Sequence, residues 1–567
     1  MPRLSAGQAM VEALRAEDVR YIFGVVGSSY LDILDAMYGR QDIRFVGCRH
    51  EQGAGFMALG YARASGQAGV CIAQNGPGVT NLVTNAAAAL LCHTPMVILG
   101  GAPMMAQTYK DSYQELDQMG VFRPVCKEAL QVNRPERAPE ILRHAFRIAT
   151  SGKMGPVYVD LPRDLLGAKE LEVQLPPPSA YRPDQRPEGD SQRVREAAAL
   201  LRAARSPVVL AGGGVVWSLA HQETCRLAEV LGAPIVTSYE RNDAVPNSHP
   251  MYVGALGRAG APEALEAIRQ ADVVLALGTR LGHFTTFYEY RYVPESARII
   301  QVEIDQKELG RHYPLAVGIL GDAGAVARAL LRSLEEAVAP AIRQARASAV
   351  ARLREKRRQR LEAEARLEGL PMKPQRVYAE LRRVLPPDTA VVFDAGGCPA
   401  LGYDRIEFSG PRTMFATLDL GCIGSAFPEA IGVKMARPDQ PVLSINGDGG
   451  FFMNAQELET AVRWKVPVVT IVMNNGSWGS EKAYQRFLYG ERYVEADIGN
   501  PRYDKLAELC GGRGFYVERP EEVGPAVREA LALEVPSVIE MPVDPNELPY
   551  PARVADVFQA AGKKTTP

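Results

Sequence analysis

Short apolar runs alternate with longer amphipathic stretches along most of the chain. In the first third, these runs are rich in Val, Ile and Ala. They occupy residues 19–27, 43–51, 69–78, 95–103 and 155–162. Apolar runs of this length, separated by helical stretches, predict βαβ units whose strands lie parallel in one sheet.

The same alternation returns twice more. The second set of runs, which ends near Asp322, occupies residues 206–214, 233–239, 271–282 and 297–305. A third unit extends from about Pro371 to Pro542. A chain of 567 residues is too long for one hydrophobic core. We therefore predict an α/β protein of three doubly wound parallel-sheet domains, which span residues 1–173, 191–335 and 371–550.

Two segments of different composition separate these units. Residues 174–190 are polar and rich in proline, as expected of an exposed linker. Residues 335–370 carry many charges of both signs on good helix formers. We predict a solvated connecting helix in this second segment and no binding arm.

Composition narrows the class of partner. The formal net charge is −2, so no basic excess favours nucleic acid or an anionic membrane. The eight cysteines are scattered without a CxxC pair, which favours free thiols in a reducing compartment. The N-terminus lacks a signal-peptide core, and no apolar run approaches the roughly 20 residues that span a bilayer. We expect a cytoplasmic protein that acts on a small molecule.

Polar residues follow two neighbouring strands of the third unit. Asp448 stands between two glycines after the run 441–446, and Asn475 ends the next run. Their side-chain oxygens and the Ser477 carbonyl are ligands that Mg²⁺ accepts beside phosphate and water. Each motif alone also suits an ordinary turn. Together, at the carboxyl ends of parallel strands, they predict a site for a metal ion and a diphosphate.

The stretch from Gly447 to Asn475 resembles the metal-diphosphate motif of thiamine diphosphate enzymes. Residues 50–63 and 69–81 resemble the pyrimidine-binding domain of the acetolactate synthase-like members of that superfamily. The resemblance implies that Glu51 hydrogen-bonds the aminopyrimidine ring, promoting the tautomer that deprotonates the thiazolium C2 carbon. Without the resemblance, a lone Glu at a helix start would be interpreted as a helix cap.

The resemblance implies further cofactor contacts. Ile423 would hold the cofactor in a bent shape, and the carbonyl of Gly421 would accept a hydrogen bond from it. The remaining candidates are Gly76, Asn81, Asp394, Gly396, Gly397, Gly447, Gly449 and Gly450. Taken singly, such residues also suit plain strand-to-helix turns or ordinary core positions.

Two segments are candidates for contact with the substrate. One matches the family's substrate loop and places Gln114 on the substrate side of the cofactor, where we expect it to act in catalysis. The Phe that precedes this Gln in the family is a Tyr here, and the next residues are closer to those of oxalyl-CoA decarboxylases. In the other segment, Trp478, Lys482 and Arg486 could stack on and pair with an anionic substrate. An ordinary amphipathic helix would explain these three residues equally well.

Three stretches are most similar to the sulfoacetaldehyde acetyltransferase family. They are residues 24–35 with 71–81, residues 271–284 with 299–305, and residues 475–485. Enzymes of that family form a cofactor adduct with sulfoacetaldehyde, expel sulfite and transfer an acetyl group to phosphate. Lys110 and Arg123 join Lys482 and Arg486 as candidate cations for the sulfonate and the phosphate. The seven histidines include no His-His pair, which argues against the simple 2-oxo acid decarboxylases.

Other functions stay open on the sequence. They are an acetolactate synthase-like carboligase acting on 2-oxo acids, an enzyme of the oxalyl-CoA decarboxylase or 2-hydroxyacyl-CoA lyase type, and an inactive regulatory homologue. The glycine-rich turn at residues 212–214 could hold ADP or FAD, although a plain turn is favoured because the G-x-G-x-x-G pattern is absent. The resemblance implies a thiamine diphosphate-dependent transferase or lyase. It also implies a homodimer or homotetramer whose active sites lie at subunit interfaces.

Overall fold

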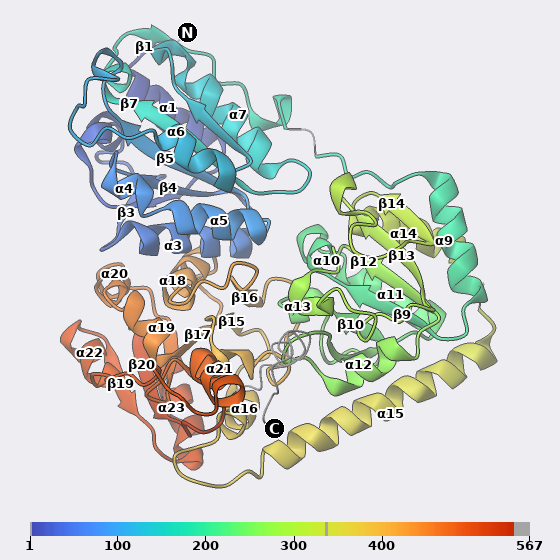
Figure 1. The fold of residues 1–567 in the computed structure, drawn as a ribbon. Helices are drawn as coiled ribbons and strands as arrows, with labels where there is room; N and C mark the ends of the chain where they lie inside the picture. Colours follow the sequence, from blue (N-terminus) through green and yellow to red (C-terminus); the bar gives the residue numbers. More distant parts are fainter. Residues whose placement is uncertain (1–2, 183, 335–337, 549–567) are drawn as a thin grey trace.

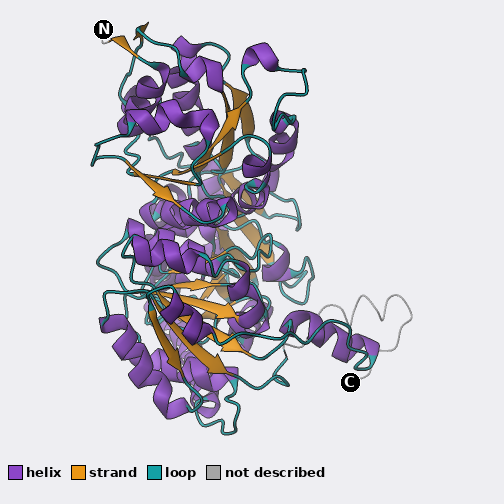
Figure 2. Ribbon diagram, turned by 90° about the vertical axis from the view of Figure 1, so that its left-hand side faces the viewer, coloured by secondary structure: helices purple, strands orange, loops and turns teal. Residues whose placement is uncertain are grey.

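Three parallel β-sheets of six strands each organise the chain (Figure 1). The computed structural model describes residues 3–182, 184–334 and 338–548. Helices cover both faces of the sheets (Figure 2). The predicted fold class, an α/β protein of three doubly wound parallel-sheet domains, is confirmed. The sheets lie inside the predicted domain ranges, whose ends at residues 1, 335 and 550 fall outside the described residues.

The first sheet has the strand order β3-β2-β4-β5-β7-β6. Its strands are β2 (Tyr21–Gly24), β3 (Arg44–Gly47), β4 (Gly69–Ala73), β5 (Met96–Ala102), β6 (Glu128–Gln131) and β7 (Pro156–Pro162). Its larger helices are α1 (Ala6–Ala16), α3 (Glu51–Ser65), α5 (Val83–Leu91) and α7 (Ala138–Thr150). A two-stranded antiparallel sheet, β1 (Arg3–Leu4) with β8 (Leu171–Glu172), lies beside it. The connection after β2 leads to the strand on one side, and the connection after β4 leads to the strand on the other side. The strand order therefore reverses between β2 and β4, and a crevice opens at their carboxyl ends.

The third sheet repeats this order as β16-β15-β17-β18-β20-β19. Its strands are β15 (Ala390–Phe393), β16 (Met414–Ala416), β17 (Val442–Gly447), β18 (Val469–Asn474), β19 (Arg513–Tyr516) and β20 (Ser537–Pro542). Its helices include α16 (Pro374–Val384), α18 (Ala426–Ala436), α19 (Asp448–Met453), α20 (Glu457–Arg463), α21 (Gly479–Tyr489), α22 (Tyr503–Leu509) and α23 (Pro520–Ala532). The equivalent crevice lies between β15 and β17.

The central sheet has a different order, β11-β10-β9-β12-β13-β14, which is common among dinucleotide-binding folds. Its strands are β9 (Pro207–Ala211), β10 (Ile235–Thr237), β11 (Tyr252–Ala255), β12 (Val273–Leu277), β13 (Arg298–Glu303) and β14 (Val317–Leu320). Its helices include α9 (Ser191–Ala203), α10 (Gly213–Ser218), α11 (His221–Leu231), α12 (Pro262–Arg269) and α14 (Ala323–Leu334). The strands β9 and β12 are buried along their whole length, as expected of a parallel sheet covered on both faces.

The first and third domains meet where α3 lies on α18 (Figure 1). A Cβ atom at Gly60 would lie 2.1 Å from the Glu429 carbonyl oxygen, and one at Gly432 would lie 1.9 Å from the Met57 carbonyl oxygen. Only glycine therefore permits this approach. The Arg63 guanidinium, buried at the crossing, donates to a Glu429 carboxylate oxygen at 2.9 Å.

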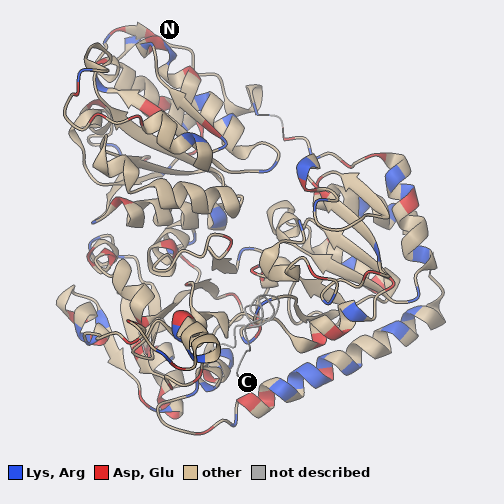
Figure 3. Ribbon diagram, viewed as in Figure 1, with Lys and Arg blue, Asp and Glu red and all other residues tan. Residues whose placement is uncertain are grey.

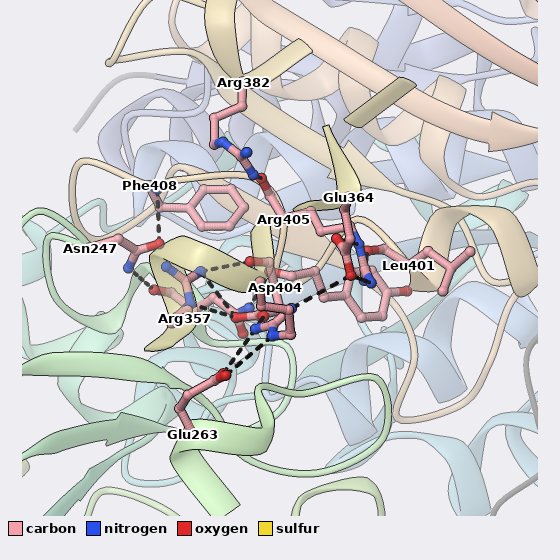
Figure 4. Close-up of polar contacts among 12 residues, drawn as sticks. Asn247, Glu263, Arg357, Glu364, Arg382, Leu401, Asp404, Arg405 and Phe408 are labelled. Carbon is pink, nitrogen blue, oxygen red and sulfur yellow. Dashed lines mark hydrogen bonds and ion pairs between the residues drawn. The ribbon is translucent and has the colours of Figure 1, made fainter. Parts of the chain in front are cut away.

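The helix α15 (Pro340–Glu364) connects the central and third domains, as the charged segment predicts. Figure 3 shows Lys and Arg positions, coloured blue, along much of its length. Arg357 donates from Nε and Nη2 to Asp404 Oδ1 at 3.1 and 3.0 Å (Figure 4). Arg360 donates to Asp404 Oδ2 at 2.6 Å and to Glu263 at 3.0 Å. This network ties α15 to both domains. Among the described helices, none combines the length and apolar composition needed to cross a membrane.

Candidate active site

The metal candidates lie at the carboxyl edge of the third sheet. Asp448 directly follows β17 and is only 2% exposed. Its Oδ2 atom accepts hydrogen bonds from the Gly476 N–H at 2.7 Å and from Asn500 Nδ2 at 2.8 Å. Burial raises the pKa of the Asp448 carboxyl, while these donors lower it. A bound cation would favour the ionised form further.

Asn500 is a contact that the sequence analysis missed. Its Nδ2 atom also donates to Asn474 Oδ1 at 3.0 Å, and its Oδ1 atom lies 2.8 Å from the Tyr503 hydroxyl. The same hydroxyl lies 3.0 Å from the Asp448 carbonyl oxygen. Asn500 belongs to the loop between α21 and α22, away from the strand ends that guided the prediction. It orients the Asp448 carboxylate.

The loop after β18 leaves oxygen atoms available. Ser477 pairs with Asp497 in an isolated antiparallel bridge, whose hydrogen bonds join Trp478 N to Ala496 O and Ile498 N to Gly476 O. The Ser477 carbonyl takes no part in those bonds. The Ser477 side chain is buried, and its Oγ atom has no hydrogen-bond partner among the described residues. The Asn475 amide oxygen accepts only a long bond of 3.3 Å from the Ser477 N–H.

The three substrate candidates that follow are already engaged. A Cβ atom at Gly449 would lie 2.5 Å from Trp478 Cζ3, so the indole packs over the glycine turn. Lys482 Nζ lies 2.5 Å from Asp497 Oδ1, and Arg486 Nε lies 3.3 Å from Glu491 Oε1. Both cations therefore have carboxylate partners in this structure.

Asp394 is fully buried beside the turn that follows the cofactor candidates Gly421 and Ile423. Its carboxylate oxygens accept the N–H groups of Gly424 and Ser425 at 3.0 and 3.1 Å. This carboxyl group thereby fixes the turn after Ile423, whose side chain is 39% exposed. No atom lies within 4 Å of a Cβ position at Gly421, which has φ +80°.

The remaining glycine candidates lie around the same crevice. No atom lies within 4 Å of a Cβ position at Gly447, whereas one at Gly450 would meet Asp394 Oδ2 at 2.1 Å. Gly396, with φ +151°, precedes the short helix α17 (Gly397–Ala400). A larger side chain at Gly450 would displace the carboxylate that holds the turn.

Glu51 is the first residue of α3, in the first domain. Its Oε2 atom accepts a hydrogen bond from Asn81 Nδ2 at 2.9 Å, so the two predicted residues are in contact. The N-terminus of α3 is held from the third domain, because the buried Glu457 accepts the backbone N–H groups of His50 at 3.0 Å and Arg49 at 3.2 Å. Sequence reasoning missed Glu457, since its partners lie about 400 residues earlier.

The loop that carries Gln114 is built on the turn after β4. Gln114 has φ +61°, and its Oε1 atom accepts a hydrogen bond from Gln74 at 2.9 Å. Gln118 accepts the N–H of Gly76 at 2.8 Å and donates to the buried Asp160 at 2.6 Å. These bonds fix the base of the loop.

The outer part of this loop is exposed. Tyr113, next to Gln114, is 85% exposed. Lys110 and Arg123 are exposed too, and their side chains have no hydrogen-bond or ion-pair partner in the part of the chain that the structure describes. These two cations are the unpaired members of the predicted set of four.

The two halves of the candidate site lie outside two cavities of the described residues. These cavities, of about 670 and 720 Å³, are lined by neither Glu51 nor Asp448 nor Asn475. Apolar side chains beside the halves are exposed: Ile423 next to the glycine turn, and Phe452, 54% exposed, on α19.

The larger of these cavities opens on the central domain and is also lined by residues of the first and third domains. It opens at the carboxyl ends of β9 and β12, where the strand order reverses, and the backbones of Gly214 and Gly278 approach closely there. Lys153, Arg241 and Arg280 lie among its lining residues. This is the place where the sequence suggested ADP or FAD.

Comparison with known proteins gives the same three divisions. Thiamine pyrophosphate enzyme family models match residues 4–121 (N-terminal TPP binding domain), 194–330 (central domain) and 394–541 (C-terminal TPP binding domain).

Full-length relatives include sulfoacetaldehyde acetyltransferases of Alcaligenes xylosoxydans xylosoxydans and Castellaniella defragrans, each 37% identical. The first match covers 94% of this chain and 91% of the relative, and the second covers 93% and 90%. A probable acetolactate synthase large subunit of Methanocaldococcus jannaschii is 35% identical over 98% of this chain and 95% of its own length. The chain therefore belongs to the thiamine pyrophosphate (thiamine diphosphate) enzyme family, and it is a thiamine diphosphate-dependent enzyme.

Proposed function

We propose that the diphosphate of the cofactor binds at the edge of the third sheet through Mg²⁺. Asp448, Asn475 and the Ser477 carbonyl would hold the metal ion, and Gly447, with Gly449 and Gly450, would face the phosphates. Two observations support the fit: the buried Ser477 hydroxyl has no hydrogen-bond partner among the described residues, and the space beside Gly447 is open. Oxygen ligands of this kind suit Mg²⁺.

We propose that Glu51 contacts the other end of the cofactor. Thiamine diphosphate, when bound, would supply a nucleophilic carbon for addition to a carbonyl group and an electron sink for the bond that then breaks. Glu51 would hold a proton at the pyrimidine ring through Oε1, because Asn81 already occupies Oε2. Glu457 keeps this carboxyl group in place by capping the start of α3.

We propose that the complete site forms between two subunits, with Glu51 from one and Asp448 from the other, in a homodimer or homotetramer. Two observations support this. The cavities of about 670 and 720 Å³ in the described part of the chain are lined by neither Glu51 nor Asp448. The apolar Tyr113, Ile423 and Phe452 are exposed beside the two halves, and a second subunit would bury them.

For the reaction, we propose conversion of sulfoacetaldehyde and phosphate to sulfite and acetyl phosphate. The observation that carries this proposal is the 37% identity to a sulfoacetaldehyde acetyltransferase across 94% of the chain. The C–S bond breaks and sulfite leaves with the bonding electrons. The aldehyde carbon loses its hydrogen as a proton and forms a bond to a phosphate oxygen, while the neighbouring carbon gains a proton and becomes the methyl group. No external oxidant or reductant is needed.

Both substrates are anions, so the site needs cations. The exposed Lys110 and Arg123 are unpaired among the described residues, whereas Lys482 and Arg486 contact carboxylates. We propose that the first pair receives the sulfonate or the phosphate, with Gln114 placed between them and the cofactor. The second pair would contribute only if its carboxylate partners moved.

Sulfite release tests this proposal. The purified chain, with thiamine diphosphate and Mg²⁺, is incubated with sulfoacetaldehyde with and without phosphate, and sulfite and acetyl phosphate are measured. We expect equal amounts of both products, only when phosphate is present. Acetolactate formed from pyruvate without sulfite release would favour a carboligase, a function that the 35% identity to a probable acetolactate synthase large subunit supports.

Parallel incubations with CoA thioesters test a third reaction class. Turnover of oxalyl-CoA or a 2-hydroxyacyl-CoA would identify the CoA-dependent type, and no turnover of any substrate would indicate an inactive homologue. A nucleotide in the central cavity and a cytoplasmic location stay predictions from the sequence, and the family match calls for neither.

A further inference from the structure

One wall of the central cavity brings together side chains from all three domains. Cys92 follows α5 in the first domain, Glu240 follows β10 in the central domain, and Asp419 follows β16 in the third. The Cys92 sulfur and one carboxylate oxygen from each acid all lie within 4.8 Å of one another. None of these residues has a part in the proposed reaction.

One carboxylate oxygen of the buried Glu240 has no hydrogen-bond partner among the described residues. Glu240 is 2% exposed, and the oxygen without a partner is its Oε2 atom. The nearest cation is Arg241, whose Nη1 atom lies 3.7 Å from that oxygen, beyond hydrogen-bonding distance. A buried charged oxygen without a bonded partner is costly. Glu240 also has φ +66°, a conformation that non-glycine residues adopt mainly where the surroundings impose it.

We propose that Cys92, Glu240 and Asp419 bind a divalent metal ion of the zinc class. One sulfur and two carboxylate oxygens suit Zn²⁺ better than Mg²⁺, which prefers oxygen ligands alone. Three protein ligands leave a fourth position that faces the cavity, for water or for another ligand. The ion would satisfy the Glu240 oxygen and join the three domains at one point.

The surroundings of the cluster fit a metal site. Arg280 donates to the Asp419 carboxylate, and metal-ligating carboxylates commonly accept such a bond from a neighbour. His93 lines the same cavity, and its Nδ1 atom donates to the Leu90 carbonyl at 3.0 Å. That bond leaves Nε2 as an acceptor, the form in which histidine binds metals. His93 is not a member of the group of three close ligand atoms, so the fourth position is left for water or another ligand.

An arrangement without metal is the competing explanation for this cluster. Arg241 and Arg280 already offset the charges of Glu240 and Asp419, and the two carboxyl groups could share a proton. In that case the Cys92 thiol would stay protonated. The two arrangements differ in whether the sulfur bonds a metal ion, which spectroscopy detects directly.

Cobalt binding tests the proposal. The full-length protein is treated with a chelator, returned to excess Mg²⁺ with thiamine diphosphate, and titrated with Co²⁺. A Co²⁺–thiolate bond produces a charge-transfer band in the near ultraviolet, which the oxygen-only site at Asp448 cannot produce. We expect this band to saturate at one ion per chain and to disappear when Zn²⁺ is added.

Variants identify the ligands. Cys92→Ser should abolish the band, and Glu240→Gln should weaken Co²⁺ binding by at least about 10-fold. Cys225→Ser, which changes a half-buried free thiol on α11, is the matched control and should retain the band. Absence of the band in the wild-type protein would overturn the proposal and favour the shared proton, and so would a band that persists in Cys92→Ser. If Cys92→Ser fails to fold, the wild-type titration and the Glu240→Gln variant still distinguish metal binding from a shared proton.

Discussion

Asp394 shows how burial and hydrogen bonding oppose each other at a single residue. Burial raises the pKa of its carboxyl group to about 7, while the N–H groups of Gly424 and Ser425 lower it. An ordinary aspartate has a pKa of 3.8. Between these values, the folded protein holds a proton that the unfolded chain has released. The stability from this group is therefore fully present below 3.8 and is lost as the pH rises through about 7.

The loss of stability with rising pH gives a prediction for Asp394→Asn. In the cofactor-free wild-type protein, the contribution of Asp394 to the free energy of unfolding should fall as the pH rises from 3.8 to about 7. The variant cannot ionise, so it should lack this part of the slope, whatever its absolute stability. Urea unfolding of both proteins across this range provides the measurement. Equal slopes would show that the Asp394 pKa is not raised.

Glu51 gives a prediction about catalysis. Glu51→Gln keeps the size of the side chain and its contact with Asn81 but cannot hold a titrating proton. We expect a loss of roughly 10²–10⁴ in kcat, with thiamine diphosphate still bound through the metal half of the site. Activity and calorimetric affinity for the cofactor separate these effects. The control is Glu172→Gln, on the exposed strand β8, and an equal loss in both variants would contradict the assignment.

Sequence reasoning predicted some residues of the candidate site and missed others for a physical reason. Asp448 and Asn475 follow apolar strands, and such strand ends are visible in the pattern of the chain. Glu457, Asn500 and Gln118 act through contacts between distant segments, which no local pattern records. The orphaned Ser477 hydroxyl is likewise visible only once the loop is folded.

At the scale of elements, the crossing of α3 and α18 positions the first domain on the third. The close approach depends on Gly60 and Gly432, and the buried pair of Arg63 and Glu429 lies at the same crossing. Because Glu51 begins α3, any shift of this helix would also move the candidate catalytic carboxyl group.

Gly60→Ala tests the importance of the crossing. The new methyl group would lie 2.1 Å from the Glu429 carbonyl oxygen, so the helices must separate. We expect a loss of about 1–3 kcal/mol in the free energy of unfolding, although alanine is the better helix former. Gly499→Ala, where no atom lies within 4 Å of the added group, is the control. A variant as stable as the wild-type protein would show that α3 and α18 can separate without a loss of stability.

At the scale of the whole molecule, the site requires residues from two chains in our account. Mixing two inactive variants tests this directly. In a heterodimer of Glu51→Gln and Asp448→Asn subunits, one site carries both changes and the other carries neither. Random exchange of subunits should restore about a quarter of the wild-type activity.

The measurement is activity after the two variants are mixed under conditions that allow subunit exchange. Each variant, treated alone in the same way, is the control. A mixture as inactive as its components, with exchange shown independently, would mean that Glu51 and Asp448 act within one chain.

The strands and the connecting helix could be predicted from the sequence more readily than their arrangement in the folded chain. Continuous apolar runs such as 69–78 predict buried parallel strands, and the charged segment 335–370 predicts the connecting helix that α15 forms. The strand orders and the contact between α3 and α18 depend on long-range packing, so the sequence pattern alone could not define them.

The assay that tests the central claim most directly measures sulfite and acetyl phosphate from sulfoacetaldehyde and phosphate, with thiamine diphosphate and Mg²⁺ present. Our account predicts equal release of both products, which disappears without the cofactor and falls with Glu51→Gln. Robust turnover of pyruvate or an acyl-CoA with no sulfite release would contradict the proposed reaction.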